Sequence, residues 1–270
     1  MKKHLVNFLL FLILLTGFSL LLYPTVSDYW NSMHQSRAIA DYTQSIANLD
    51  ETDYTQLWQA ALDYNAALPE KLNRFFMTDE EREAYGALLY VSSNIMGYIE
   101  IPKIECRLAI YHGTGESALQ VGVGHIEGSS LPTGGLGTHC ALSGHRGLPS
   151  AKLFTNLDRM AEGDVFMLKV LNETLTYEVD QILVVEPDDM SGLDIDPQQD
   201  YCTLVTCTPY GINSHRLLVR GHRIETVEEK EKIHVTAEAE DVPRDRVAMI
   251  LAVPVVLLWI LITILFRRKR

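Results

Sequence analysis

Two long apolar runs near the ends of the chain constrain its fold most strongly. The first covers residues 5–23 after Lys2 and Lys3, and the second covers residues 247–266 before the basic residues 267–270. About twenty residues at helical rise cross a bilayer core of roughly 30 Å. We therefore predict a transmembrane helix at each end of the chain.

Each run has an alternative interpretation. The first could be a cleaved secretory signal, but its apolar stretch is longer than is usual for a signal, and Tyr23-Pro24-Thr25 does not resemble a small-residue cleavage site. The second could be a buried core helix, but the adjacent basic cluster favours a membrane span. We interpret the first run as an uncleaved anchor.

The basic residues at both ends predict the topology. Segments rich in Lys and Arg stay in the cytoplasm, so residues 1–4 and 267–270 should be cytoplasmic and the middle of the chain extracytoplasmic. Without the six Lys and Arg residues of these two segments the chain has 23 − 6 = 17 basic against 35 acidic residues, a formal charge of −18. So acidic a domain would be repelled by phosphate, which argues against nucleic acid as a partner. The expected location is the cell membrane, as a multi-pass protein.

The middle of the chain divides into three segments of different character. Residues 24–95 carry apolar side chains at intervals of three and four, which predicts a helical spacer or lid. Residues 96–225 alternate short apolar, β-branched runs with Gly, Pro and Asn, which predicts an all-β sandwich or barrel of antiparallel strands. Residues 226–246 read as a charged linker. The expected strands cover residues 96–102, 106–111, 140–143, 165–170, 174–179, 182–185, 203–205 and 217–219.

Four cysteines lie in this β domain, and one of them ends an apolar run. Cys202 and Cys207 differ by five positions, so they face opposite sides of one strand and should not bond to each other. The spacing contains no CxxC pair, which argues against a zinc or redox site. Cys207 can therefore be a free thiol, although a single strand cysteine is more often an inert buried residue.

The sequence around Cys207 predicts a strand that ends at Cys207, a loop, and a second strand that begins at Arg216. A thiol nucleophile needs a base or cation to become a thiolate, and its attack needs a donor for the oxyanion. Arg216 is permanently charged and can serve as that donor. The alternative is a surface arginine paired with a carboxylate, and Arg146, Arg220 and Arg223 are rivals.

Histidine is the natural base, and six histidines lie in the β domain. His145 has the most informative context, because Gly144 and Gly147 place it where a strand opens into a loop. If the segment before Arg216 is extended, His215 and Arg216 point to opposite faces, and only one of them shares the face of Cys207. From the residues alone, His145 competes with His112, His125, His139, His215 and His222.

Several motifs resemble one protein family. Thr203-Leu-Val-Thr-Cys207 resembles the TLxTC signature of sortases, with an arginine nine residues later and a Gly-His-Arg upstream. Residues 122–132, 143–154 and 208–221 are similar to the class C, pilin-polymerising branch, as is the second apolar run at the C-terminal end. The resemblance covers roughly residues 96–223.

The resemblance implies an eight-stranded sortase β-barrel on a Gram-positive cell surface. It assigns the nucleophile to Cys207, the acid/base to His145 and the oxyanion stabiliser to Arg216. The implied reaction cleaves an LPxTG-like signal between Thr and Gly and joins the acyl group to a lysine amine of LPxTG-bearing pilin subunits. Alternatives are a wall-anchoring sortase that uses a peptidoglycan amine, or an idle surface scaffold. We expect no cofactor and no metal ion, calcium included.

One departure from the family concerns the lid. Class C sortases commonly carry an Asp-Pro-aromatic triplet that plugs the active site, and no such triplet precedes the β domain. At the corresponding place stands Asn73-Arg-Phe75-Phe76. Either Phe75 or Phe76 acts as a plug without the aspartate, or the lid is absent and these residues pack the spacer on the barrel.

Overall fold

The structure is a computed structural model that describes residues 2–226. The predicted span 247–266, the tail 267–270 and all but the first residue of the linker 226–246 lie outside the described residues.

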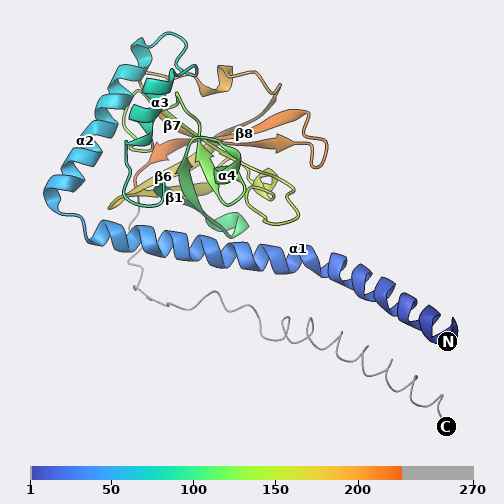
Figure 1. Ribbon diagram of the computed structural model, residues 1–270. Coiled ribbons are helices and arrows are strands. Elements are labelled where there is room, and N and C mark those ends of the chain that lie inside the picture. The colour runs from blue at the N-terminus through green and yellow to red at the C-terminus, as the bar shows by residue number, and fades with distance from the viewer. Residues whose placement is uncertain (1, 227–270) are drawn as a thin grey trace. The chain divides into compact units, whose positions relative to one another are not determined.

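In the described part of the chain, the three longer α-helices precede all the strands, and one short α-helix lies among the strands (Figure 1). The helices are α1 (Lys2–Ala47), α2 (Glu51–Ala67), α3 (Asp79–Gly86) and the short α4 (Glu116–Leu119). The strands are β1 (Ile95–Ile101), β2 (Cys106–His112), β3 (Val123–His125), β4 (Thr138–Gly144), β5 (Val165–Val170), β6 (Glu173–Val185), β7 (Asp200–Thr208) and β8 (His215–Ile224).

The eight strands close into a barrel in the order β1-β2-β3-β4-β7-β8-β6-β5. This confirms the eight-stranded barrel, but the expectation of purely antiparallel strands was wrong. β2 pairs with β3 in parallel, and so does β4 with β7. Parallel neighbours need a long connection, and the crossover between β4 and β7 contains β5 and β6.

Two strands, β6 and β3, also differ from the prediction. Residues 174–179 and 182–185 belong to one strand, β6, because a register shift between Val179 and Gln181 bends the pairing with β8 without ending it. β3 was not predicted, because its three residues include a glycine and form no apolar run.

The barrel interior is filled by alternate residues of the strands, as the period of two requires. On β4 and β7 the inward side chains include Leu142 and Leu204, both fully buried in the core cluster. Phe166 of β5 stacks on Tyr177 of β6, with ring centroids 5.5 Å apart. The outward residues of β4, β7 and β8 therefore form a separate face.

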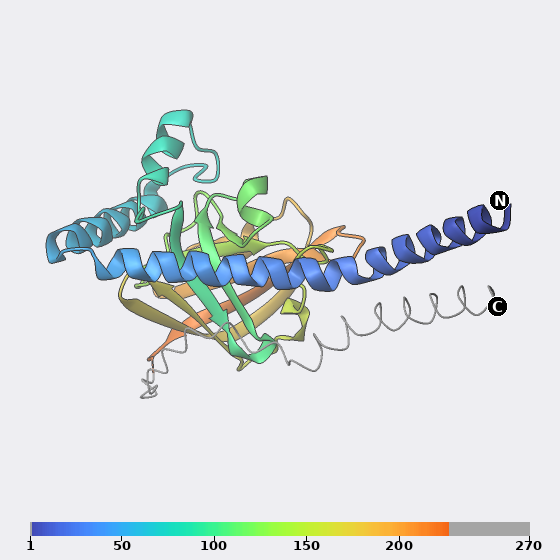
Figure 2. The ribbon, with the colours of Figure 1, turned by 60° about the horizontal axis from the view of Figure 1, so that its bottom comes forward.

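α1 is continuous through Pro24, and its two parts have different surroundings. Its N-terminal part carries exposed apolar side chains and is the one helix among the described residues that is long and apolar enough to cross a membrane. Its C-terminal part packs across β1 and β2 (Figure 2). There the Tyr42 hydroxyl donates to the Met96 carbonyl at 2.8 Å and accepts from the Leu171 amide at 2.9 Å.

α2 and α3 complete the helical segment predicted for residues 24–95. Asp50 caps α2, and Thr78 with Glu81 forms a capping box on α3, which fixes where each helix begins. The buried Asn65 amide of α2 accepts from the Leu131 amide at 2.7 Å and donates to the Thr133 hydroxyl at 2.8 Å. α2 thus holds the connection between β3 and β4.

Candidate functional site

Cys207 and Arg216 are direct cross-strand partners. β7 and β8 pair antiparallel, and their register places Cys207 opposite Arg216 near the end of the ladder. Directly opposed residues of neighbouring strands point to the same face of a sheet. Arg216 therefore shares the face of Cys207, and His215 does not. Cys207 is half-buried. In contrast, the residues of β7 that face the other way, Cys202, Leu204 and Thr206, are buried in the barrel.

His145 follows the neighbouring strand at the same end of the barrel. The parallel register pairs Ser143 of β4 with Val205 of β7, two residues before His145 and Cys207 respectively. The Thr206 hydroxyl donates to the Gly144 carbonyl at 2.7 Å, which ties together the residues that precede them. The structure thus brings the three predicted residues to one end and one face of three adjacent strands.

The ring of His145 differs from those of three rival histidines in its hydrogen bonding. Its Nε2 is buried and has no hydrogen-bond partner within residues 2–226. In contrast, both ring nitrogens are engaged in three rivals, His112, His125 and His139. A buried ring nitrogen without a hydrogen-bond partner lowers the stability of the fold unless a bound molecule supplies the missing hydrogen bond. His145 therefore keeps a ring nitrogen unengaged where these three rivals do not.

Arg216 is likewise distinguished from two of its rivals, Arg146 and Arg220. Its Nη1 donates to the carbonyls of His215 and Asn213 at 3.2 and 3.4 Å, and no carboxylate pairs with it among the described residues. Arg146 is paired with Asp158, and Arg220 is paired with Asp180. An arginine held by backbone carbonyls keeps its charge available to an oxyanion.

Arg146 holds the His145 loop against the Cys207 loop. Its guanidinium pairs with Asp158 at 2.5 Å, donates to the Thr208 hydroxyl at 3.4 Å and lies 5.9 Å from the Tyr210 ring. This positioning role was missed from the sequence, where Arg146 figured only as a rival oxyanion donor. The Gly-His-Arg context places the residue next to His145 but does not reveal its partners.

The connection between β6 and β7, residues 186–199, covers the outward face beside the site. Its Gly192 packs on Leu218, the outward residue two positions after Arg216. His139 anchors it, because Nδ1 donates to the Asp194 carbonyl at 2.8 Å while Nε2 accepts from the Thr203 hydroxyl at 2.7 Å. Burial lowers the pKa of His139 to about 4, with contributions from Arg220 and Arg74, so the ring is neutral at pH 7.

The stretch at the place of the family's lid is fastened by Arg74. Its Nη2 donates to the Leu193 carbonyl at 2.6 Å, and its guanidinium lies 4.5 Å from the Phe75 ring. The backbone of Arg74 and Phe75 passes directly over Gly128, where a side chain would not fit. Phe76 is 83% exposed and so fills no pocket. The stretch therefore packs on the barrel connections through Arg74 and Phe75.

All four cysteines are free thiols in the structure, which confirms that Cys202 and Cys207 do not bond. Cys140 and Cys202 are fully buried in the core. Burial also raises the pKa of Cys106 to about 12. A thiol in such an apolar setting is a poor nucleophile, and this leaves Cys207 as the suitable one.

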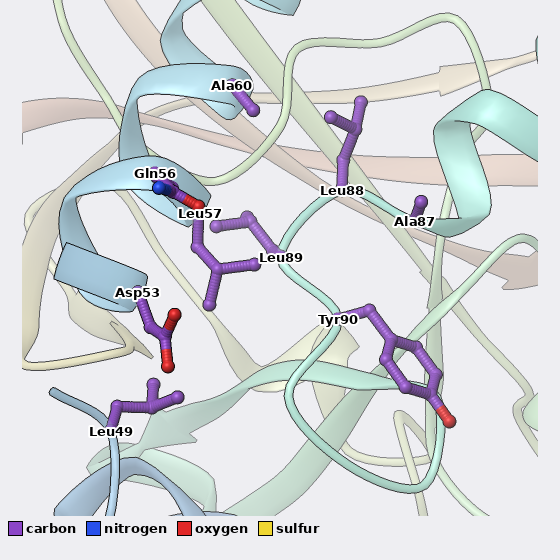
Figure 3. A pocket seen from close by; sticks show the side chains of 9 residues that line it. All are labelled: Leu49, Asp53, Gln56, Leu57, Ala60, Ala87, Leu88, Leu89 and Tyr90. Atoms are coloured by element: carbon purple, nitrogen blue, oxygen red, sulfur yellow. The ribbon is translucent and has the colours of Figure 1, made fainter.

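A separate cavity of about 340 Å³ lies in the helical segment (Figure 3). Leu57 of α2 and Leu89 after α3 line it, and none of the three candidate residues does. It is a gap in the packing between α2 and the segment before β1, distinct from the candidate site.

Comparisons with known proteins agree with the fold. Residues 99–224 match the family model of the sortase domain. The sortase C1 structure from Streptococcus agalactiae is 51% identical and superposes with a TM-score of 0.68, covering 70% of this chain and 99% of that one. A structure of Clostridium perfringens sortase C with the C-terminal cell wall sorting motif is 43% identical with a TM-score of 0.63, covering 71% and 100%.

The curated relatives match over a shorter region. Sortase D of Bacillus subtilis is 31% identical over 131 residues, which is 47% of this chain and 63% of that protein. The chain therefore spans less than two thirds of the length of this relative.

Proposed function

This chain belongs to the sortase family, and on that premise we propose that it is a cysteine transpeptidase of the class C, pilin-polymerising kind. The observation that carries the proposal is the register that opposes Cys207 to Arg216, with His145 at the end of the adjoining parallel strand. The likeness to class C sortase structures at 40–51% identity supports the branch.

The first half of the proposed reaction forms a thioester. The Cys207 thiolate attacks the carbonyl carbon between Thr and Gly of an LPxTG-like sorting signal. Arg216 donates to the oxyanion of the tetrahedral intermediate, which is where negative charge develops. His145 protonates the leaving amine through the ring nitrogen that has no partner in the described part of the chain. The acyl group then remains on Cys207 as a thioester.

The second half transfers the acyl group to an amine. A lysine of the next pilin subunit loses a proton to His145 and attacks the thioester, and the Cys207 thiolate leaves. The thioester conserves the energy of the cleaved peptide bond, so the step needs no nucleotide. The partner proposed here is an LPxTG-bearing pilin; the structure of the Clostridium perfringens relative was solved with the C-terminal cell wall sorting motif, which supports the substrate class.

We further propose that the enzyme is held at the membrane with its catalytic domain outside and both termini inside. The apolar N-terminal part of α1 supports the first span, residues 5–23. The boundaries of the spacer 24–95, the catalytic domain 96–225 and the second span 247–266 belong to the same proposal. Deleting residues 247–266 should lower the polymer yield in cells, and an unchanged yield would contradict the need for a second anchor.

Substitution Cys207→Ala tests the enzymatic proposal. The full chain is incubated with an LPxTG-like peptide and a lysine-bearing pilin, and mass spectrometry follows the thioester adduct and the new isopeptide bond. Both should disappear in Cys207→Ala and persist in Cys106→Ala, which removes a thiol that no step uses. Persistence of both products in Cys207→Ala would favour an idle scaffold. A product formed only with a peptidoglycan amine would instead favour a wall-anchoring sortase.

A further inference from the structure

Two buried cysteines that the reaction does not use lie next to each other inside the barrel. The parallel register of β4 and β7 pairs Cys140 directly with Cys202, and both side chains are fully buried in the core. Each lies five positions before a candidate catalytic residue, since His145 follows Cys140 and Cys207 follows Cys202. An odd separation places the cysteine pair inside the barrel and the reactive pair outside.

We propose that Cys140 and Cys202 form a disulfide in the exported protein, which ties together the two strands that carry His145 and Cys207. The proposal rests on the extracytoplasmic location proposed above, because disulfides persist in oxidising surroundings.

The strand geometry suits the bond. Neighbouring strands are about 4.8 Å apart, and disulfides join Cα atoms about 4.4–6.8 Å apart. Both side chains point into the same interior, so closure needs a rotation of the thiols without a shift in register. Cys106, in contrast, donates toward the Leu153 carbonyl, and its strand β2 adjoins β1 and β3 instead of β4 and β7.

A metal site is a weaker use of the same residues. The His125 imidazole lies beside the Cys140 thiol, which would make a third ligand conceivable. However, no group of three His, Cys, Asp or Glu side chains within residues 2–226 is placed to hold a metal ion. The His125 ring is also occupied by the Tyr85 hydroxyl at 2.8 Å and the Ser130 carbonyl at 2.8 Å.

The bond forms by thiol–disulfide exchange with a low-molecular-weight or protein disulfide. The Cys140 thiolate attacks one sulfur of that oxidant and releases the other as a thiol, which gives a mixed disulfide. The Cys202 thiolate then attacks the Cys140 sulfur and releases the second thiol. The two cysteine protons end on the two released thiols, and the oxidant takes up two electrons. Because both sulfur atoms are covered in the folded barrel, the exchange takes place as β4 and β7 pair and before the barrel closes.

Closing this loop should stabilise the barrel. The two cysteines are 62 positions apart (202 − 140), a long loop whose closure removes much entropy from the unfolded chain. For a domain of this size we expect reduction to lower the Tm by roughly 5–10 °C. The Cys140→Ala/Cys202→Ala variant should show no such difference between reducing and non-reducing buffer.

Differential alkylation of the full chain, extracted from the membranes of a host that exports it, tests the proposal. Acid-quenched, denatured protein is labelled with N-ethylmaleimide, reduced, labelled with iodoacetamide and mapped by mass spectrometry. In most molecules Cys140 and Cys202 should carry the second label and appear as one linked peptide before reduction. Cys106 should carry the first label, as the internal control.

The outcomes separate this proposal from the proposed function. Labelling of Cys207 by a membrane-impermeant maleimide in intact protoplasts checks that the domain is outside, and the mapping itself requires no transfer activity. If Cys207 is labelled from outside while Cys140 and Cys202 carry the first label in most molecules, the disulfide is refuted. A linked peptide that joins either cysteine to a different partner refutes it equally.

Discussion

Lowering the pH should destabilise this protein through His139, the histidine that anchors the connection between β6 and β7. Its ring is 1% exposed and neutral, and its pKa in the fold is about 4 against an ordinary value of 6.5. The unfolded chain therefore binds a proton at a higher pH than the folded chain does. Stability from this residue is complete above pH 6.5 and is lost progressively as the pH falls toward 4.

The size of the loss follows from the two pKa values. At pH 5, protonation of this one group raises the equilibrium constant for unfolding by a factor of about 30. This corresponds to a loss of about 2 kcal/mol in the free energy of unfolding. At pH 4 and below the loss approaches about 3 kcal/mol. These magnitudes apply to a buried ring, because solvent cannot screen it.

Urea unfolding of the full chain in detergent at pH 7.5 and pH 5 measures the effect. His139→Gln removes the titration, and other groups that titrate in this range act alike in both proteins. The wild type should lose about 2 kcal/mol more than His139→Gln between the two pH values. Equal losses would refute the reasoning, since the folded state would then bind the proton as readily as the unfolded state.

Three substitutions test other contacts. Tyr42→Phe should lower the free energy of unfolding by about 1–3 kcal/mol, because two buried backbone groups lose their partner, while Tyr90→Phe, at an exposed site, should change little in the same urea titration. Asn65→Ala should cost a similar amount by unpairing the Leu131 amide, and an unchanged midpoint would show that α2 does not hold that connection. Arg216→Ala should lower kcat for transfer by about 10²–10³-fold, whereas retained turnover would move the oxyanion role to another arginine.

The motifs around Cys207 could be read from the sequence, because each depends on near neighbours in the chain. A thiol at the end of an apolar run, a glycine-flanked histidine and an arginine at the start of the next run are all local patterns. Alternation along a strand also showed that only one of His215 and Arg216 can share the face of Cys207. Alternation alone could not choose between them.

The choice required the register of the barrel, which is a tertiary property. The pairing of Cys207 with Arg216 depends on the length and conformation of the loop between them. The position of His145 beside them depends on the parallel pairing of β4 with β7, which are separated in the chain by β5 and β6. The same pairing places Cys140 beside Cys202, although nothing in their separation predicts a contact. Hydrogen bonding between strands distant in the sequence carries no local signal.

The two apolar runs and the motif-bearing strands were thus determined by the sequence itself, because hydrophobic length and side-chain alternation are properties of consecutive residues. That a ring nitrogen of His145 stays unpaired and that Arg216 pairs with no carboxylate, both among residues 2–226, was decided only in the folded barrel. Those outcomes depend on contacts that form when the sheet closes. The Thr206 hydroxyl binds the residue before His145, and Asp158 and Asp180 pair with the two rival arginines.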